Sequence, residues 1–435
     1  MVSLLVASTA QGSVTFQADV ETHIQPGKGA QGAPSDASAS FRVTLGGDYL
    51  LIQSVDGTMR FDFTRFKRVE ISADGRSRVD YSLYDTIGFR VMELRNREML
   101  GKMLASVKVG DKLMSTVENE HVLAVQEKAS SPLKERAEGE EDTYRNDGKI
   151  LFRRSNQTTE VSPADARMFA QFIRYQFGGH PQILNDLANA KSIPAQITLI
   201  TNDGREITRR ISVKSLLPFE GVPMDVAVIP GRSSPASIDP VDQALDRGAA
   251  IVSTDYDAAK QRVKDDIALA FREHRVFDAF LGSLEWSLMT GEGLSAIGPD
   301  EMNQAKQSEP VQRLAAALGV KSKDGLADAA KTIADLKSTT LSKKHVLTIF
   351  EANDRAMLGD PSTAKQLFVS ALSINPYIAG AYKDFGDALL AQFDAPRAWR
   401  SWDIGRKLAP TFRNFGAVNQ LERSLASEHP EYFLK

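Results

Sequence analysis

The side chains best suited to chemistry in this chain are its histidines, which can act as general acids, as bases or as metal ligands. The six are widely scattered, at His23, His121, His180, His274, His345 and His429. A zinc site on one helix needs two histidines about four residues apart, as in H-E-x-x-H, so that both rings face one ion. No pair of histidines here has that spacing, and the chain contains no cysteine. We therefore predict no metal site, no cofactor and no thiol nucleophile.

Two short motifs and one acidic cluster match catalytic or phosphate-binding sequences only in part. Gly27-Lys28-Gly29 has the glycines of a phosphate-binding loop, but no serine or threonine follows the lysine. Ser131 and Lys134 have the S-x-x-K spacing of serine acyl-enzymes, but they lie in a charged segment rather than in the rigid, dry site that activates a nucleophile. Four carboxylates within residues 138–142 are better explained as the solvated surface of a loop. No complete catalytic motif is present, so we predict that the protein is not an enzyme.

Several residues admit both a functional and a structural interpretation. Tyr81, Tyr84, Phe89 and Arg90 lie where predicted strands give way to a predicted helix, and they could line a pocket or fill a core equally well. His274 lies on an apolar helical stripe, where a histidine is more often a buried residue with a hydrogen-bond partner than a ligand. A hydrolase assembled from dispersed residues stays an alternative function, and it requires that such side chains converge in a deep pocket.

Length and composition indicate a folded globular protein. The chain has 435 residues, of which 42% are hydrophobic and 25% charged, a balance typical of globular rather than disordered proteins. At roughly 150 residues per domain, this length allows several domains. The formal net charge of -3 gives no basic surface for nucleic acid or anionic lipid. No stretch reaches the roughly 18 apolar residues of a membrane-spanning helix. We predict no nucleic-acid partner and no membrane span.

The first 12 residues are compatible with the end of a secretory signal. Val2–Ala7 form a short apolar run, and the three residues after it are small, as a signal peptidase requires. No basic residue precedes the run, so a buried first strand is the alternative interpretation. A signal would direct the protein to the bacterial periplasm or the exterior, whereas a cytoplasmic location follows if residues 1–12 are simply a strand.

Residues 13–217 are predicted to form an α+β domain built on a curved antiparallel sheet. Apolar and polar residues alternate over 14–21 and again over 41–45, which is the period-two pattern of a strand with one buried face. The dipeptides Asp56-Gly57 and Asp74-Gly75 lie between such runs and suit hairpin turns, since glycine accepts a positive φ. The sequence therefore predicts a meander of strands.

A few helices and loops interrupt these strands. Residues 26–39 are rich in glycine, alanine and serine and are predicted to form a loop, and the charge-rich residues 127–149 are predicted to form an exposed loop. Apolar residues recur at helical spacing over 89–105. A second helix is expected to begin after Ser162, because serine is a favoured N-cap and Pro163 a favoured first helical residue.

The second half of the chain is predicted to be helical. Residues 218–239 contain several prolines, glycines and serines and are interpreted as a linker to a helical domain at residues 240–435. Asp239 is a suitable N-cap for the first helix of this domain, which is expected to end near Gly248. Apolar residues then follow one helical stripe from Val263 to Leu288 at spacings of three and four residues.

A repeat pattern near the C-terminus is the most specific signal in the sequence. Its members stand at fixed offsets: Tyr382, Phe385, Gly386, Leu389, Ala398, Trp402, Gly405 and Pro410. Their classes and spacing resemble the tetratricopeptide repeat, which runs W-x-x-L-G-x-x-Y, then A, F, A and P. The resemblance implies an antiparallel helix pair over residues 379–412. It places Gly386 and Ala398 at the closest approach of the two helices, Trp402 between them, and Pro410 at the end of the second helix.

Half of the same pattern recurs 34 residues earlier, at Ala364, Phe368, Ala371 and Pro376. The first helix of this earlier unit departs from the family, because Thr348, Glu351, Ala352 and Arg355 occupy the signature positions. The resemblance therefore covers residues 345–412. Such repeats need about three units to bury a continuous core. Either the helices upstream of residue 345 belong to the stack, or the β-rich domain covers its end.

The resemblance also implies a function. Stacks of these repeats present a concave face that binds proteins or peptides, and the pattern places Lys383, Asp387 and Leu390 on that face. We therefore expect a non-catalytic binding or scaffold protein with a protein or peptide partner. In the alternative, the N-terminal meander resembles the open half-barrels of periplasmic lipoprotein carriers, which hold lipid in an apolar concavity. The aromatic and methionine residues of 41–104 are compatible with such a lipid site.

Overall fold

The computed structural model describes residues 14–434, except residues 28–32, 106–113, 129–131, 203, 220–238 and 321. The predicted fold class is confirmed: an antiparallel sheet within residues 14–218 is followed by helices within residues 240–428, which makes the chain α+β. The chain divides into two compact units. The β unit comprises Met1–Ile229 and Ser424–Lys435, and the helical unit comprises Pro230–Arg423.

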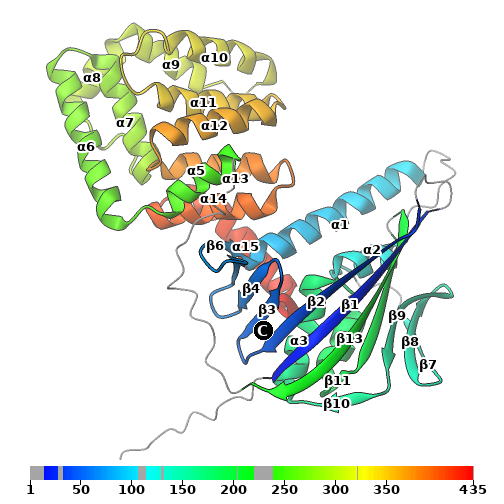
Figure 1. Ribbon diagram of the computed structural model, residues 1–435. Helices are drawn as coiled ribbons and strands as arrows, with labels where there is room; N and C mark the ends of the chain where they lie inside the picture. The colour runs from blue at the N-terminus through cyan, green and yellow to red at the C-terminus, as the bar shows by residue number, and fades with distance from the viewer. Residues whose placement is uncertain are drawn as a thin grey trace, which may run out of the picture. The chain divides into compact units, whose positions relative to one another are not determined.

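The β unit is built on an 11-stranded antiparallel sheet with the order β6-β5-β4-β3-β2-β1-β13-β12-β9-β8-β7 (Figure 1). Its strands are β1 (Val14–Pro26), β2 (Ser35–Leu45), β3 (Tyr49–Ser54), β4 (Gly57–Asp62), β5 (Lys67–Ser72), β6 (Arg78–Ser82), β7 (Lys134–Glu138), β8 (Glu141–Asn146), β9 (Lys149–Ser155), β12 (Gln196–Asn202) and β13 (Arg205–Pro218). A separate two-stranded sheet joins β10 (Thr158–Glu160) to β11 (Ser192–Pro194). Most neighbours in the large sheet are consecutive strands, but β1 pairs with β13 and so joins the first strands to the last.

Both hairpins predicted from Asp-Gly dipeptides are present. Ser54 pairs with Gly57 at the end of β3 and β4, and Gly57 has a φ of +146°. Gly75, in the turn between β5 and β6, has a φ of +67°. Residues with a Cβ rarely adopt such values, so glycine explains why the chain turns at these two points.

Two predicted loops are replaced wholly or partly by strands. Strands β1 and β2 extend to Pro26 and from Ser35, so the loop expected at 26–39 is shorter than predicted. The prediction of an exposed loop at 127–149 is wrong for the residues of β7 and β8, which form a hairpin beside β9. Ion pairs join the charged side chains of neighbouring strands, as between Arg154 and Glu135 at 3.0 Å. Charged residues are also typical of a sheet edge such as β7, where they discourage pairing with other chains.

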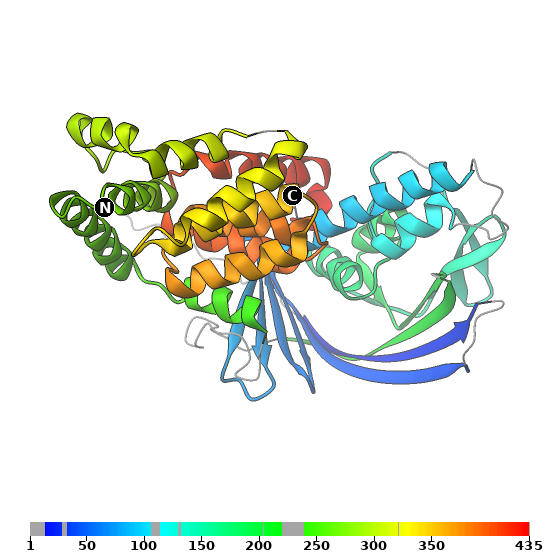
Figure 2. The same ribbon diagram turned by 90° about the horizontal axis from the view of Figure 1, so that it is seen from above.

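Four helices of the β unit lie on the concave side of the curved sheet (Figure 2). They are α1 (Leu83–Ala105), α2 (Thr116–Leu123), α3 (Pro163–Gln176) and α4 (Pro181–Asn189). The Ser162 side chain accepts a hydrogen bond from the Asp165 amide, which confirms the predicted start of α3. The ring of Phe16 on β1 lies 5.9 Å from that of Phe169 and 5.8 Å from that of Phe172, both on α3. Aromatic side chains of the protein itself therefore fill the space between α3 and the sheet.

The last residues of the chain belong to the β unit rather than to the helical domain predicted for residues 240–435. Tyr432 is fully buried, and the Phe433 ring lies 4.9 Å from the Tyr84 ring and 5.3 Å from the Phe66 ring. The prediction is wrong here because these contacts join residues that are distant in the sequence. We refer to residues 428–434 as the C-terminal segment.

The helical unit consists of short helices joined by short connections (Figure 1). They are α5 (Pro240–Ala249), α6 (Ser253–Arg272), α7 (Val276–Thr290), α8 (Pro299–Gln307), α9 (Glu309–Leu318), α10 (Lys323–Leu336), α11 (Lys344–Met357), α12 (Pro361–Ile374), α13 (Ala379–Leu390), α14 (Ala395–Leu408) and the first part of α15 (Gly416–Glu428). The Asp239 side chain accepts a hydrogen bond from the Val241 amide, so the predicted N-cap of α5 is confirmed. Among the described residues, no helix is both long and apolar enough to cross a membrane.

The single helical stripe expected from Val263 to Leu288 is divided between two helices. The turn between α6 and α7 contains His274, which is exposed and has a φ of +56°. The interpretation of His274 as a core residue is therefore wrong. The apolar pattern continues across the turn because Ile267 of α6 and Leu281 of α7 are both buried, at 3% and 0% exposure.

Candidate functional site

Helices α13 and α14 approach most closely at Gly386. A Cβ atom at this glycine would lie 2.3 Å from Trp402 Nε1 and 3.0 Å from the Ala398 carbonyl oxygen, so a larger residue requires a displacement. Trp402 is 2% exposed, and its Nε1 donates hydrogen bonds to the Lys383 carbonyl and to Asp387 Oδ1, both at 3.1 Å. Glycine and tryptophan are therefore matched in size at this contact between the helices.

The other residues of the predicted repeat pattern occupy related places in two consecutive helix pairs. Tyr382, Phe385 and Leu389 are buried on α13, whereas Ala364, Phe368 and Ala371 are buried on α12. Pro376 and Pro410 follow the ends of α12 and α14. The pattern thus marks residues that hold each pair of helices together, which is a structural role.

The three residues predicted to face a partner lie together on α13. Lys383 Nζ donates to Asp387 Oδ2 at 2.6 Å, and their side chains are 22% and 48% exposed. Burial disfavours the charged ammonium, but the hydrogen bond with Asp387 prevails and raises the pKa of Lys383. Leu390 is half-buried. This face of α13 therefore presents an ion pair that is already formed, rather than a free charge.

Helix α7 packs against α11 and α13, and a buried carboxylate anchors it to α11. Glu285 on α7 is 1% exposed, with Oε1 2.6 Å from both His345 Nε2 and Asn375 Nδ2 and Oε2 2.8 Å from Lys343 Nζ. Burial alone would favour the protonated acid, but the hydrogen bond to His345 and the charges of His345 and Lys343 lower the pKa of Glu285 to about 2. This cluster fixes the position of α7 and has no exposed reactive group.

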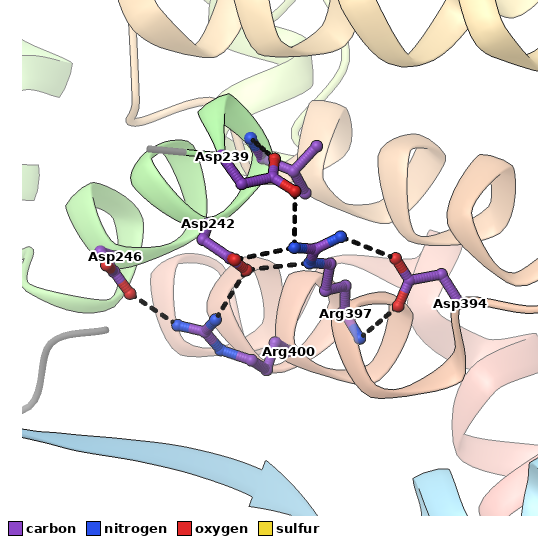
Figure 3. A network of polar contacts seen from close by, with 7 residues as sticks. Asp239, Asp242, Asp246, Asp394, Arg397 and Arg400 are labelled. Carbon is purple, nitrogen blue, oxygen red and sulfur yellow. Dashed lines mark hydrogen bonds and ion pairs between the residues drawn. The ribbon is translucent and has the colours of Figure 1, made fainter. Parts of the chain in front are cut away.

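Helix α5 is joined to α14 by the network of carboxylates and arginines in Figure 3. Arg397 donates to Asp242 through Nε at 2.9 Å and through Nη2 at 2.7 Å, and it also contacts Asp239 at 2.7 Å. Arg400 contacts Asp246 at 2.8 Å. Hydrogen bonds to Asp242 raise the pKa of Arg397 above its ordinary range. Every cation of the network faces a carboxylate, so its chemistry is that of a structural clamp.

The exposed edge formed by the turns within the two helix pairs has a different character. Gln392 Nε2 donates to the Pro361 carbonyl at 3.2 Å, so the α11–α12 turn and the α13–α14 turn are neighbours. Met357 ends α11 and Phe393 lies in the second turn, and their exposures are 57% and 50%. Phe393 also has a φ of +61°, a left-handed conformation that is unfavourable for a bulky residue. We call Met357, Pro361, Gln392 and Phe393 the turn edge.

In the β unit, the structure brings together two histidines that are distant in the sequence. His121 Nδ1 accepts a hydrogen bond from the His180 amide at 2.9 Å, and His180 Nε2 lies 3.2 Å from Glu120 Oε2. All three side chains are buried. Burial, together with the nearby His180, lowers the pKa of His121 to about 4, so this ring is neutral near pH 7.

The chemistry open to this histidine cluster is limited. Because His121 Nδ1 is an acceptor, the ring carries its proton on Nε2, and His121 lines a cavity of about 360 Å³ together with Thr201 and Lys149. It can therefore donate a hydrogen bond into this cavity but is not placed as a base. The sequence gave a weak signal for the cluster, namely Gly178 and Gly179 before His180, whose φ values of +89° and +111° allow the chain to approach α2.

The remaining candidates from the sequence do not assemble into a site within the described residues. Ser131 lies outside those residues, as do Lys28 and Gly29, so the two partial motifs have no described geometry. His23 is on the exposed surface, where its Nδ1 lies 2.6 Å from Asp36 Oδ1. Across the described part of the chain, no group of three or more acidic or histidine side chains is arranged to hold a metal ion.

A larger cavity, of about 590 Å³, lies between α3, α4 and the C-terminal segment. Residues that line it include Gln171, Arg174, Leu184, Ala188, His429 and Leu434. Its volume is within the range of small-molecule sites, about 300–1,000 Å³. The sequence gave no signal for this cavity, because its walls come from segments that are about 250 residues apart (Arg174 and His429).

The C-terminal segment is fixed beside this cavity by specific hydrogen bonds. Arg174 Nη1 donates to the Glu431 carbonyl at 2.6 Å, and Tyr175 donates its hydroxyl to the Tyr432 carbonyl at 3.0 Å. The Tyr432 hydroxyl donates to the Ala124 carbonyl at 2.8 Å. The segment is thus an integral wall of the cavity.

No family model matches this chain, and no curated protein is similar to it in sequence. The functional argument therefore depends on the geometry of these sites alone.

Proposed function

We propose that this chain is a non-catalytic binding protein whose helical unit recognises a protein or peptide. The observation that carries the proposal is the turn edge, where two large apolar side chains, Met357 and Phe393, are at least half exposed on adjoining turns. Exposed apolar residues that adjoin one another are typical of interaction sites. Phe393 adds a second argument, because it retains an unfavourable backbone conformation without filling a core.

The face of α13 with Lys383, Asp387 and Leu390 is the second surface to which the proposal extends. Its ion pair is formed within the helix, so a partner would have to replace or extend the contact between Lys383 and Asp387. Partly exposed ion pairs contribute about 0–1 kcal/mol each, so this exchange is feasible but adds little affinity. Apolar contact at the turn edge is therefore the main source of binding in this proposal.

Affinity capture with the full chain, followed by titration of the purified partner, tests the proposal. We expect Phe393→Gly combined with Met357→Ser to weaken binding about tenfold or more, because both apolar contacts are lost. The matched control is Ile374→Ser at the end of α12, which removes an apolar side chain with 62% exposure outside the turn edge. Equal losses in the control and the double variant would show that the turn edge is not a specific site.

A third variant distinguishes the two surfaces. Lys383→Glu combined with Leu390→Asp changes the α13 face and leaves the turn edge intact. If this variant loses the partner while the turn-edge variant retains it, the α13 face carries the binding and the role of Phe393 is refuted. Loss in both variants would indicate one partner that covers both surfaces.

The proposal includes export to the periplasm or beyond, for which the apolar run in residues 1–12 is the support; these residues lie outside the described part of the chain. The alternative of a lipid carrier finds less support, because Phe169 and Phe172 pack against Phe16 on the concave side of the sheet. Native mass spectrometry of the intact protein tests that alternative, since a carrier would retain an acyl chain during purification.

A further inference from the structure

The cavity beside the C-terminal segment contains a buried cation whose charge is not neutralised. Arg174 is 4% exposed and lines the cavity. Its Nη1 donates to two neutral acceptors, Gln171 Oε1 at 2.9 Å and the Glu431 carbonyl at 2.6 Å. Within the described residues, no carboxylate oxygen lies within the 4.0 Å of an ion pair with this guanidinium. An unpaired buried charge is costly, so a counter-charge at this place would stabilise the fold.

A second arginine increases the positive potential at the same place. Arg90 donates through Nη1 to the Arg174 carbonyl at 2.9 Å and to the Tyr432 hydroxyl at 3.0 Å. Both guanidinium groups also lie over the Tyr432 ring, at 5.8 Å for Arg90 and 5.0 Å for Arg174. The contacts recorded for Arg90 likewise include no carboxylate among the described residues. Two cations therefore share one aromatic ring next to the cavity.

Two nitrogen atoms on buried side chains that line the cavity have no hydrogen-bond partner among the described residues. One is Arg174 Nε, and the other is His429 Nε2 on a side chain that is 2% exposed. Buried polar atoms are almost always hydrogen-bonded, so an unpaired pair beside one cavity indicates a missing acceptor. Leu184, Ala188 and Leu434 supply apolar surface in the same cavity.

We propose that this cavity binds a small amphipathic carboxylate. The carboxylate oxygens accept hydrogen bonds from Arg174 Nε and His429 Nε2, and the hydrocarbon part lies against Leu184, Ala188 and Leu434. The inference goes beyond the partner recognition proposed for the helical unit, because all the residues involved belong to the β unit. The cavity volume of about 590 Å³ accommodates a ligand of several carbon atoms.

Calorimetric titration of the full-length protein with hexanoate is the primary test. We expect saturable binding with a Kd of about 1 mM or tighter, and binding about tenfold weaker for hexan-1-ol, which has the same chain and no charge. Absence of saturable hexanoate binding, or equal affinity for hexan-1-ol, would overturn the proposal. A third titration uses inorganic phosphate; tighter binding of phosphate than of hexanoate would also overturn it, since the apolar wall would then have no role.

A matched pair of variants locates the binding in the cavity without touching the polar groups that hold the C-terminal segment. Ala188→Phe places a ring in the cavity, whereas Ala190→Phe places one two residues further along, at an exposed position that does not line it. We expect Ala188→Phe to weaken hexanoate binding about tenfold and Ala190→Phe to leave it unchanged. Equal affinity in the two variants would place hexanoate elsewhere and refute the site.

The variant His429→Gln tests the polar end of the site. Glutamine retains a donor but shortens its reach, so we expect weaker hexanoate binding and little change in binding of hexan-1-ol. If both ligands weaken equally, His429 acts only through the shape of the cavity and the proposed hydrogen bond is refuted. Thermal unfolding of each variant in the absence of ligand confirms that the β unit is folded.

Discussion

The helix pairs α11/α12 and α13/α14 are offset by 34 residues, yet the space between their helices is filled differently. In the second pair, Gly386 leaves room for Trp402. At the equivalent positions of the first pair stand Ala352 and Phe368, both fully buried. The larger aromatic residue thus goes with the smaller partner. The comparison suggests that each pair preserves the total volume at its contact rather than one residue type.

The two pairs also meet α7 by different means. The first pair is anchored through Glu285, which contacts His345 and Asn375. At the second pair the chains approach closely, since a Cβ on Gly380 would lie 3.1 Å from the Leu288 carbonyl oxygen. One contact is therefore polar and buried, whereas the other depends on the small size of glycine.

The largest expected effect comes from breaking the polar anchor. Glu285→Ala should lower the free energy of unfolding by about 3–5 kcal/mol, because it leaves buried donors of the first pair without their acceptor. Chemical denaturation of the variant and the wild type measures this difference. A loss below about 1 kcal/mol would mean that the buried network contributes little and that apolar packing alone holds α7.

The same anchor has a defined pH dependence. The pKa of Glu285 lies below its ordinary value of 4.5, at about 2. Its contribution to stability is therefore present above pH 4.5 and is lost as the pH falls through about 2; it amounts to roughly 3 kcal/mol. The acid unfolding of Glu285→Ala should lack this component, whereas that of Gly386→Ala should retain it.

The second prediction tests whether volume is shared between Gly386 and Trp402. Gly386→Ala alone should lower the free energy of unfolding by about 1–3 kcal/mol, since the new Cβ overlaps the indole. Adding Trp402→Phe recreates the Ala and Phe combination of the first pair and should restore part of that loss. A double-mutant cycle measures the coupling. Strict additivity of the two changes would contradict the idea that the two residues are matched.

The sequence predicted such contacts well where they depend on short-range spacing. Gly386, Ala398 and Trp402 lie within one helix pair, so their spacing in the sequence determines their meeting in space. The caps Ser162 and Asp239 are likewise local. In contrast, β7 was missed because its alternating residues are charged rather than apolar, and a charged pattern does not distinguish an edge strand from a loop.

The contacts that define the proposed anion site could not be predicted, for a different reason. Arg174 and Tyr432 are 258 residues apart, and nothing in their neighbourhoods indicates that they meet. Arg90 and Tyr84 were recognised as pocket or core candidates, but their contacts with the C-terminal segment depend on the fold of the whole β unit. Long-range pairing of this kind leaves no periodic signal.

The third prediction concerns the polar face of α11, which α13 lacks. Asp354 is 7% exposed, its Oδ2 has no hydrogen-bond partner among the described residues, and burial beside Glu351 raises its pKa to about 6. The ionised form is therefore disfavoured in the folded state above pH 6, and this penalty disappears as the pH falls towards the ordinary value of 3.8.

We expect Asp354→Asn to raise the free energy of unfolding by about 1–2 kcal/mol at pH 7.5 and to have almost no effect near pH 4. The estimate is below the full pKa difference because solvent screens part of the charge. Asp360→Asn is the matched control, since asparagine and aspartate are equally good N-caps and its effect should be small at both pH values. Destabilisation by Asp354→Asn at pH 7.5 would show that the carboxylate has a favourable partner.

The smallest effect is expected at the turns, where the two pairs differ by one residue. Both turns have the hydrogen bonds of a Schellman motif, from the Asp360 amide to the Arg355 carbonyl and from the Asp394 amide to the Leu389 carbonyl. The left-handed residue is Gly359 in the first turn, with a φ of +84°, and Phe393 in the second, with a φ of +61°.

Because the motif is the same, exchanging the residues isolates the cost of the side chain. Gly359→Ala should destabilise the helical unit by about 1 kcal/mol, and Phe393→Gly should stabilise it by a similar or smaller amount, as measured by thermal unfolding. Stabilisation by Phe393→Gly together with loss of the partner would mean that Phe393 improves recognition at the expense of the fold. Destabilisation would instead assign Phe393 to packing and remove the strain argument for the turn edge.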